Sequence, residues 1–213
     1  MQIKLICSDI DGTLLNKERE LSVRTITAIK RISPIPFILI SSRMPQAILH
    51  LQKELNITHL PMIAYNGALI TTPKTILQST EIKHQVSIDL VQFCSKMSIH
   101  LSLYHYNEWY VPAMDYWAKR ESNNTKVTPK VQDIKTTLKN WKNENKGAHK
   151  IMCMGNEKEI DTLVNFINNN FSDAIIGYRS KPTYLEIAPK NISKKTAIQF
   201  LIEHEYPNCT LEN

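Results

Sequence analysis

Three short apolar runs near the start of the chain each lead into polar residues. They are IKLICS at residues 3 to 8, FILI at 37 to 40 and MIAY at 62 to 65. Runs of this length and composition are typical of buried parallel strands. Helical patterns separate them, and this alternation predicts an α/β fold with a doubly wound parallel sheet. In such sheets, ligands bind at the carboxyl ends of the strands.

Both segments between these strands have one apolar face. The first, at residues 21 to 32, has Ser22 as a possible N-cap, and the second, at 45 to 55, starts with Pro45, which suits the first turn of a helix. Their apolar residues recur every three or four positions, at Val23, Ile26, Ile29 and Ile32 in the first and at Ile48, Leu51 and Leu55 in the second.

The pattern changes after Asn66 and Gly67. A predicted hairpin, ALITT and TILQS, is followed by a helical stretch and by aromatic strands around LSLYHYNEWYV. We therefore expect an inserted α+β domain at residues 83 to 184, and a main domain made of residues 1 to 82 and 185 to 213.

Composition limits the function classes. The net charge of +6 suits an anionic partner, but the 26 basic residues are spread along the chain rather than gathered into one tract. A small phosphorylated substrate accounts for this charge as well as a nucleic acid does, and we predict the former. There is no uncharged run of about 18 apolar residues and no signal-peptide pattern, so we expect a cytoplasmic protein without a membrane partner. No oligomeric state is predicted.

Two carboxylates spaced by one residue follow the first predicted strand, in DIDGTL at residues 9 to 14. A carboxylate can attack phosphorus and form an acyl phosphate, which divides one difficult hydrolysis into two easier steps. A second carboxyl group can protonate the leaving alkoxide and then accept a proton from water. We predict Asp9 as the nucleophile and Asp11 as the general acid and base. An incidental acidic pair in a polar turn is the weaker interpretation, because the pair directly follows an apolar strand.

The same loop suits a metal ion and a phosphate. Mg²⁺ prefers carboxylate oxygens and can relieve the repulsion between a carboxylate and a phosphate, so we predict Mg²⁺ as the cofactor, with Asp9 and Asp11 as ligands. Gly12 would let the backbone turn closely around the phosphoryl group. None of the seven histidines lies in a metal-ligand pattern such as HExxH, and we predict that His105 is a structural strand residue.

The segment LICSDIDGTLL resembles the first signature motif of the haloacid-dehalogenase (HAD) superfamily, and particularly its Cof-type sugar-phosphatase branch. The resemblance implies a HAD-like Rossmannoid core with a large α/β (C2-type) cap. It also implies a magnesium-dependent phosphatase that acts on small phosphorylated metabolites, such as sugar phosphates, through an aspartyl-phosphate intermediate.

Two later segments agree with this resemblance in order. ILISSRMP at residues 38 to 45 resembles the second motif, with Ser41 in the phosphate-binding position, Ser42 where the family usually has glycine, and Arg43 as a substrate contact. YNGALI at 65 to 70 resembles an Asn-Gly-Ala segment of the branch. Asn66 there would contact phosphate or brace the first loop, and a plain Asn-Gly turn is an equal alternative.

LEIAPKNISKK at residues 185 to 195 resembles the third motif, and the alignment selects Lys194 as the cation beside the nucleophile and phosphate. Lys190 and Lys195 compete for this assignment. The fourth motif, a Gly-Asp-x-x-x-Asp segment that supplies another magnesium ligand, has no counterpart before the chain ends in EYPNCTLEN. Two alternatives to the phosphatase therefore stay open: a truncated, catalytically weakened protein that only binds phosphorylated ligands, and a phosphomutase that uses the same groups.

Overall fold

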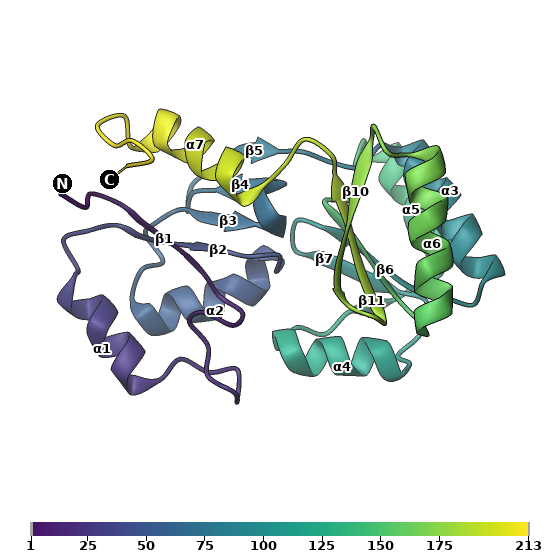
Figure 1. The fold of residues 1–213 in the computed structure, drawn as a ribbon, viewed down its shortest axis with the longest axis horizontal. Coiled ribbons are helices and arrows are strands. Elements are labelled where there is room, and N and C mark those ends of the chain that lie inside the picture. Colours follow the sequence, from purple (N-terminus) through teal and green to yellow (C-terminus); the bar gives the residue numbers. More distant parts are fainter. Residues whose placement is uncertain (1, 213) are drawn as a thin grey trace. The chain divides into compact units, whose positions relative to one another are not determined.

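Two sheets, each in its own compact unit, organise the computed structural model, which describes residues 2 to 212 (Figure 1). Unit 1 consists of Met1–Ser79 and Ile192–Asn213, and unit 2 consists of Thr80–Asn191. Among the described residues, no helix is both long and apolar enough to cross a membrane.

The sheet of unit 1 has five strands, and their spatial order follows their order in the chain. These strands are β1 (Ile6–Asp9), β2 (Phe37–Ile40), β3 (Met62–Ala64), β4 (Leu69–Thr71) and β5 (Ile76–Ser79). The first three pair in parallel, and β3, β4 and β5 pair antiparallel as the predicted hairpin. A short 3-10 turn, η1 (Tyr65–Gly67), joins β3 to β4.

Helices cover both faces of this sheet. α1 (Val23–Arg31) and α2 (Pro45–Leu55) lie on one face, and α7 (Lys194–Glu205) lies on the other (Figure 1). Because β2 has neighbours on both edges and helices on both faces, every residue of its FILI run is buried. The predicted α/β fold with a doubly wound parallel sheet is confirmed.

The sheet of unit 2 has six strands in the order β10-β11-β9-β6-β7-β8. They are β6 (His100–His105), β7 (Glu108–Val111), β8 (Lys130–Val131), β9 (Lys150–Met154), β10 (Ile175–Lys181) and β11 (Tyr184–Pro189). Its helices are α3 (His84–Lys96), α4 (Tyr116–Thr125), α5 (Ile134–Asn143) and α6 (Glu157–Asn170).

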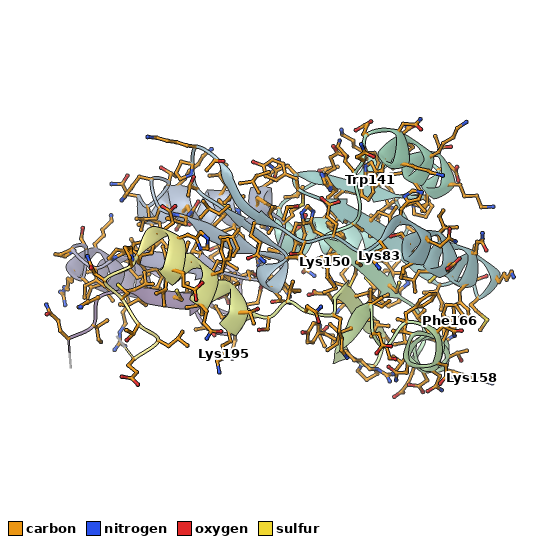
Figure 2. The ribbon with its side chains drawn as sticks, turned by 90° about the horizontal axis from the view of Figure 1, so that it is seen from above. Lys83, Trp141, Lys150, Lys158, Phe166 and Lys195 are labelled. Atoms are coloured by element: carbon orange, nitrogen blue, oxygen red, sulfur yellow. The ribbon has the colours of Figure 1, made fainter. Side chains whose placement is uncertain are left out.

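The core of unit 2 forms between one face of its sheet and the helices α3, α5 and α6, which lie side by side on that face (Figure 1). Leu101 and Leu103 of β6 point into this core, whereas Ser102 between them points to the other face of the sheet. Trp141 of α5 and Phe166 of α6 belong to the helical layer (Figure 2).

The unit boundaries differ from those expected, 83 and 184. Strand β11 pairs along one edge with β9 and along the other with β10, so its backbone hydrogen bonds place it wholly in unit 2. Residues 185 to 191 thus belong to unit 2, whereas the expected boundary assigned them to the main domain. At the other boundary, the amide of Ile82 donates to the carbonyl of Ala148 at 2.7 Å, which attaches the first residues after β5 to unit 2.

Candidate active site in unit 1

The loop after β1 places two carboxylates at the carboxyl end of that strand. Between them, Ile10 is fully buried, and its carbonyl lies 3.4, 3.0 and 3.2 Å from the amides of Thr13, Leu14 and Leu15. Gly12 has a φ of +77° and open space around its Cα, so the tight turn uses a conformation that L-residues rarely adopt. The buried anchor and the turn hold Asp11 close to Asp9, the last residue of β1.

Asp9 contacts the third predicted motif. Its Oδ1 lies 2.7 Å from Nζ of Lys194, the first residue of α7, and both side chains are partly exposed. Ser193 caps the helix by accepting a hydrogen bond from the amide of Thr196. Of the competing lysines, Lys195 is exposed on α7 (Figure 2) and Lys190 is an exposed residue of unit 2. Lys194 is therefore the lysine that the fold brings to Asp9.

The turn η1 helps to place Lys194, because it packs directly against the first turn of α7. Gly67 has a φ of +109°, and a Cβ added there would lie 2.8 Å from both Cβ of Ala197 and the carbonyl oxygen of Ser193. Both distances are too short for a real contact, so only glycine allows this approach. The Asn-Gly segment therefore serves helix packing as well as turn formation.

Asp11 is paired with two guanidinium groups. Arg43 donates to both carboxylate oxygens, with Nε 2.8 Å from Oδ2 and Nη2 2.8 Å from Oδ1. Nη1 of Arg19 lies 3.8 Å from Oδ1. Sequence reasoning expected Arg43 at the substrate and did not consider Arg19, whose positive φ in a tight turn leaves no recognisable signal in the sequence.

The second and third loops of the site are joined through their backbones. The hydroxyl of buried Ser41 accepts from the amide of Arg43 at 3.2 Å, and the Ser41 carbonyl accepts from the amide of Asn66 at 2.8 Å. Tyr65 and Asn66 both have positive φ, so Asn66 forms a turn and braces the loop at Ser41. Ser42 is not among the residues with positive φ, so the backbone conformation at this position does not require glycine.

One thiol lies on the same strand as the candidate nucleophile. Burial raises the pKa of Cys7 to about 11, so this thiol stays protonated at neutral pH. Cys7 is therefore a poor nucleophile at neutral pH, and the carboxylate of Asp9 stays the candidate on β1.

The carboxylates suit Mg²⁺ by donor chemistry, since this ion takes hard oxygen ligands and is usually held by one or two carboxylates together with substrate phosphate. Asp9 fits this role. Both oxygens of Asp11 already accept hydrogen bonds from Arg43. Within residues 2 to 212, the one group of three potential metal ligands lies elsewhere, in unit 2, and consists of Glu81, His105 and His149.

The three side chains of that group in unit 2 make hydrogen bonds that give them a structural role. His105 Nδ1 lies 2.8 Å from the carbonyl of Gly147, whose own amide donates to Glu81. His149 accepts at Nδ1 from the amide of Tyr106, and burial together with the nearby His105 lowers its pKa to about 3. His149 is therefore neutral, with its proton on Nε2, and the three side chains tie together segments that are distant in the sequence.

Comparison with known proteins identifies the family. The sequence model of the haloacid dehalogenase-like hydrolases matches residues 6–212. A relative of Haemophilus influenzae named as a phosphatase is 30% identical over 96% of this chain and 76% of its own length. Another from Buchnera aphidicola, also named as a phosphatase, is 29% identical over 92% of this chain and 73% of its own length.

Solved structures agree. The crystal structure of TM0651 from Thermotoga maritima matches this chain with a TM-score of 0.82 and a sequence identity of 26%. The match covers 95% of this chain and 75% of TM0651. The HAD subclass IIB sugar phosphatase BT4131 shares the fold at 20% identity, with a TM-score of 0.79 over 98% of this chain and 78% of that one. The chain therefore belongs to the haloacid dehalogenase-like hydrolase family.

Proposed function

We propose that this chain is a phosphatase for small phosphorylated metabolites, that sugar phosphates are its substrate class, and that the reaction passes through an aspartyl phosphate on Asp9. The observation that carries the proposal is the contact of 2.7 Å between Asp9 and Lys194, at a strand end that also holds Asp11. The substrate class rests on the fold shared with the sugar phosphatase BT4131.

In the first step, a carboxylate oxygen of Asp9 attacks phosphorus, and the bond between phosphorus and the alcohol oxygen breaks. Asp11 enters this step in its protonated form and gives its proton to that leaving oxygen, which leaves Asp11 as the carboxylate that acts as the base in the next step. In the second step, Asp11 takes a proton from water, which attacks the phosphorus of the acyl phosphate. Inorganic phosphate leaves, and the carboxylate of Asp9 is restored.

The remaining site residues bind the anion. The positive charge of Lys194, at the N-terminus of α7, offsets the negative charge of Asp9 and of the incoming phosphate. The hydroxyl groups of Ser41 and Ser42 and the side-chain amide of Asn66 are the proposed phosphate-binding groups, and Gly12 keeps side-chain atoms away from the phosphoryl group. Mg²⁺, held by Asp9 and the substrate phosphate, would supply further charge neutralisation when bound.

The proposal is tested by measuring phosphate release from a panel of sugar phosphates and from an aryl phosphate, with and without Mg²⁺. We expect release that depends on Mg²⁺ and falls below detection in Asp9→Asn. Glu54→Gln, which changes an exposed carboxylate on α2, is the matched control and should retain full activity. A folded wild-type chain that binds phosphate but releases none would favour the ligand-binding alternative, and full activity of Asp9→Asn would refute Asp9 as the nucleophile.

A further inference from the structure

Two hydrogen bonds hold the carboxylate of Asp11 in one plane. Nε and Nη2 of Arg43 each donate to a different oxygen of Asp11, and both distances are 2.8 Å. A planar guanidinium that binds a carboxylate through two parallel hydrogen bonds fixes both the position and the plane of that carboxylate. An ammonium group cannot do this, because it is a single point of charge.

The guanidinium is itself held in place. Its third nitrogen, Nη1, lies 3.5 Å from the carbonyl of Ala47 in the first turn of α2. The backbone of Arg43 is also bound on both sides, because its amide donates to the hydroxyl of Ser41 and its carbonyl accepts from the amide of Tyr65 at 3.1 Å. Arg43 thus has a fixed backbone and a fixed side chain.

Exposure decides which member of the pair a substrate can reach. The side chain of Arg43 is 5% exposed, whereas that of Asp11 is 45% exposed. Arg43 lies behind Asp11, and its hydrogen-bonding groups are directed at Asp11 and Ala47. A substrate that approaches unit 1 from solvent can therefore contact the carboxylate of Asp11 without touching the arginine.

From this geometry we infer that Arg43 is a positioning residue for Asp11 and not a substrate contact. The inference rests on the proposed function, in which Asp11 protonates the leaving oxygen. Proton transfer requires the carboxyl oxygen of Asp11 to lie within hydrogen-bond distance of the leaving oxygen. Losing the two hydrogen bonds from Arg43 should therefore lower the rate of that step. The loss should grow with the basicity of the leaving oxygen, because a phenolate leaves with little help and a sugar alkoxide needs the proton.

Arg19 provides a matched comparison. It lies 3.8 Å from one oxygen of Asp11, its side chain is 43% exposed, and its backbone is held by a hydrogen bond from its amide to the carbonyl of Asn16. An exposed pair that contacts a single oxygen contributes little to orientation. Arg19→Met therefore removes a nearby positive charge but leaves the two hydrogen bonds between Arg43 and Asp11 in place.

The kinetic test compares Arg43→Met, Arg43→Lys and Arg19→Met on a sugar phosphate and on an aryl phosphate with a good leaving group. For both Arg43 variants we expect kcat on the sugar phosphate to fall about 100-fold or more, kcat on the aryl phosphate to fall less than about 10-fold, and KM to change less than about 3-fold. Added guanidinium ion should restore part of the activity of Arg43→Met. Arg19→Met should lower kcat on the sugar phosphate by less than either Arg43 variant does, because it removes one longer contact and leaves both hydrogen bonds from Arg43 in place.

A rise in KM with unchanged kcat would overturn the inference, because it would mark Arg43 as a substrate contact. Equal losses of kcat on both substrates would overturn it as well. A second readout needs no turnover: the free energy of unfolding is measured for Arg43→Met, Asp11→Asn and the double variant. The double variant should lose less stability than the two single variants combined. Additive losses would overturn the pairing, whereas a stable wild type without any turnover would refute the proposed function alone.

Discussion

Gly67→Ala should destabilise unit 1 and displace Lys194 at the same time. Gly67 combines a φ of +109° with two contacts of 2.8 Å for any added Cβ, one to the methyl carbon of Ala197 and one to the carbonyl oxygen of Ser193. Neither neighbour is the end of a flexible side chain. The first turn of α7 would therefore have to move away from η1, and Lys194 follows Ser193 directly.

The expected loss of stability is the sum of a backbone cost, from the positive φ, and a steric cost, from the added methyl group. Holding an alanine in this region of φ costs about 1 to 3 kcal/mol. Forcing a methyl group into packed surroundings costs about 1 to 3 kcal/mol more. The sum is about 2 to 6 kcal/mol, which at a urea dependence of about 2 kcal/mol per molar lowers the denaturation midpoint by roughly 1 to 3 M.

Gly12→Ala is the matched control, because Gly12 also has a positive φ but an added Cβ would meet nothing within 4 Å. Gly12→Ala should therefore lower the free energy of unfolding only by the backbone cost of about 1 to 3 kcal/mol. Urea denaturation followed by far-UV circular dichroism reports on both units. Tryptophan fluorescence reports on unit 2, since the chain's three tryptophans, Trp109, Trp117 and Trp141, all lie there. Equal midpoints for the two glycine variants would refute the packing argument, and Gly67→Ala combined with Ala197→Gly should recover part of the loss.

Two further predictions concern unit 2. The pKa of His149 is lowered from 6.5 to about 3 in the folded chain, so between these pH values the unfolded chain binds a proton that the folded chain does not. The stabilising effect is therefore complete above about pH 6.5, and the free energy of unfolding falls toward pH 3 by up to about 1.4 kcal/mol per pH unit. His149→Gln should flatten this slope in fluorescence-detected urea titrations, and an unchanged slope would contradict the assignment. Glu108 accepts hydrogen bonds from Trp141 at 2.9 Å and from Lys146 at 2.6 Å, so Glu108→Gln should cost about 1 to 2 kcal/mol in the same assay. Glu144→Gln, at a more exposed carboxylate, should change stability by less, and equal losses would count against this explanation.

The parts of the site that sequence could predict are those determined by local pattern. An apolar run before Asp9 predicts a strand, and the structure has β1 there, with Asp9 as its last residue and Asp11 two residues later. The prediction that this strand is buried was wrong, because β1 is the edge strand of its sheet and its residues are only half-buried. A serine at a helix start places Lys194 in the first turn of α7. These are consequences of chain direction and of helix capping, so they need no knowledge of distant contacts.

The parts that could not be predicted depend on pairs far apart in the chain. Nothing near Arg43 indicates that its guanidinium turns toward Asp11, 32 residues earlier. The assignment of β11 to unit 2 depends on its pairing with β9 and β10, whereas its local sequence continues smoothly into the motif at Lys194. The close packing of Gly67 on α7 joins segments that only the folded chain brings together.

Capture of the covalent intermediate tests the central claim most directly. In Asp11→Asn the first step should persist with an aryl phosphate, whose leaving group needs little protonation, while hydrolysis of the acyl phosphate slows because the general base is lost. After acid quenching and proteolysis, mass spectrometry should find one phosphoryl group on the peptide that contains Asp9, and none in the Asp9→Asn, Asp11→Asn double variant. Turnover by the wild type with no phosphoryl group on that peptide, or with the group on another residue, would contradict the account.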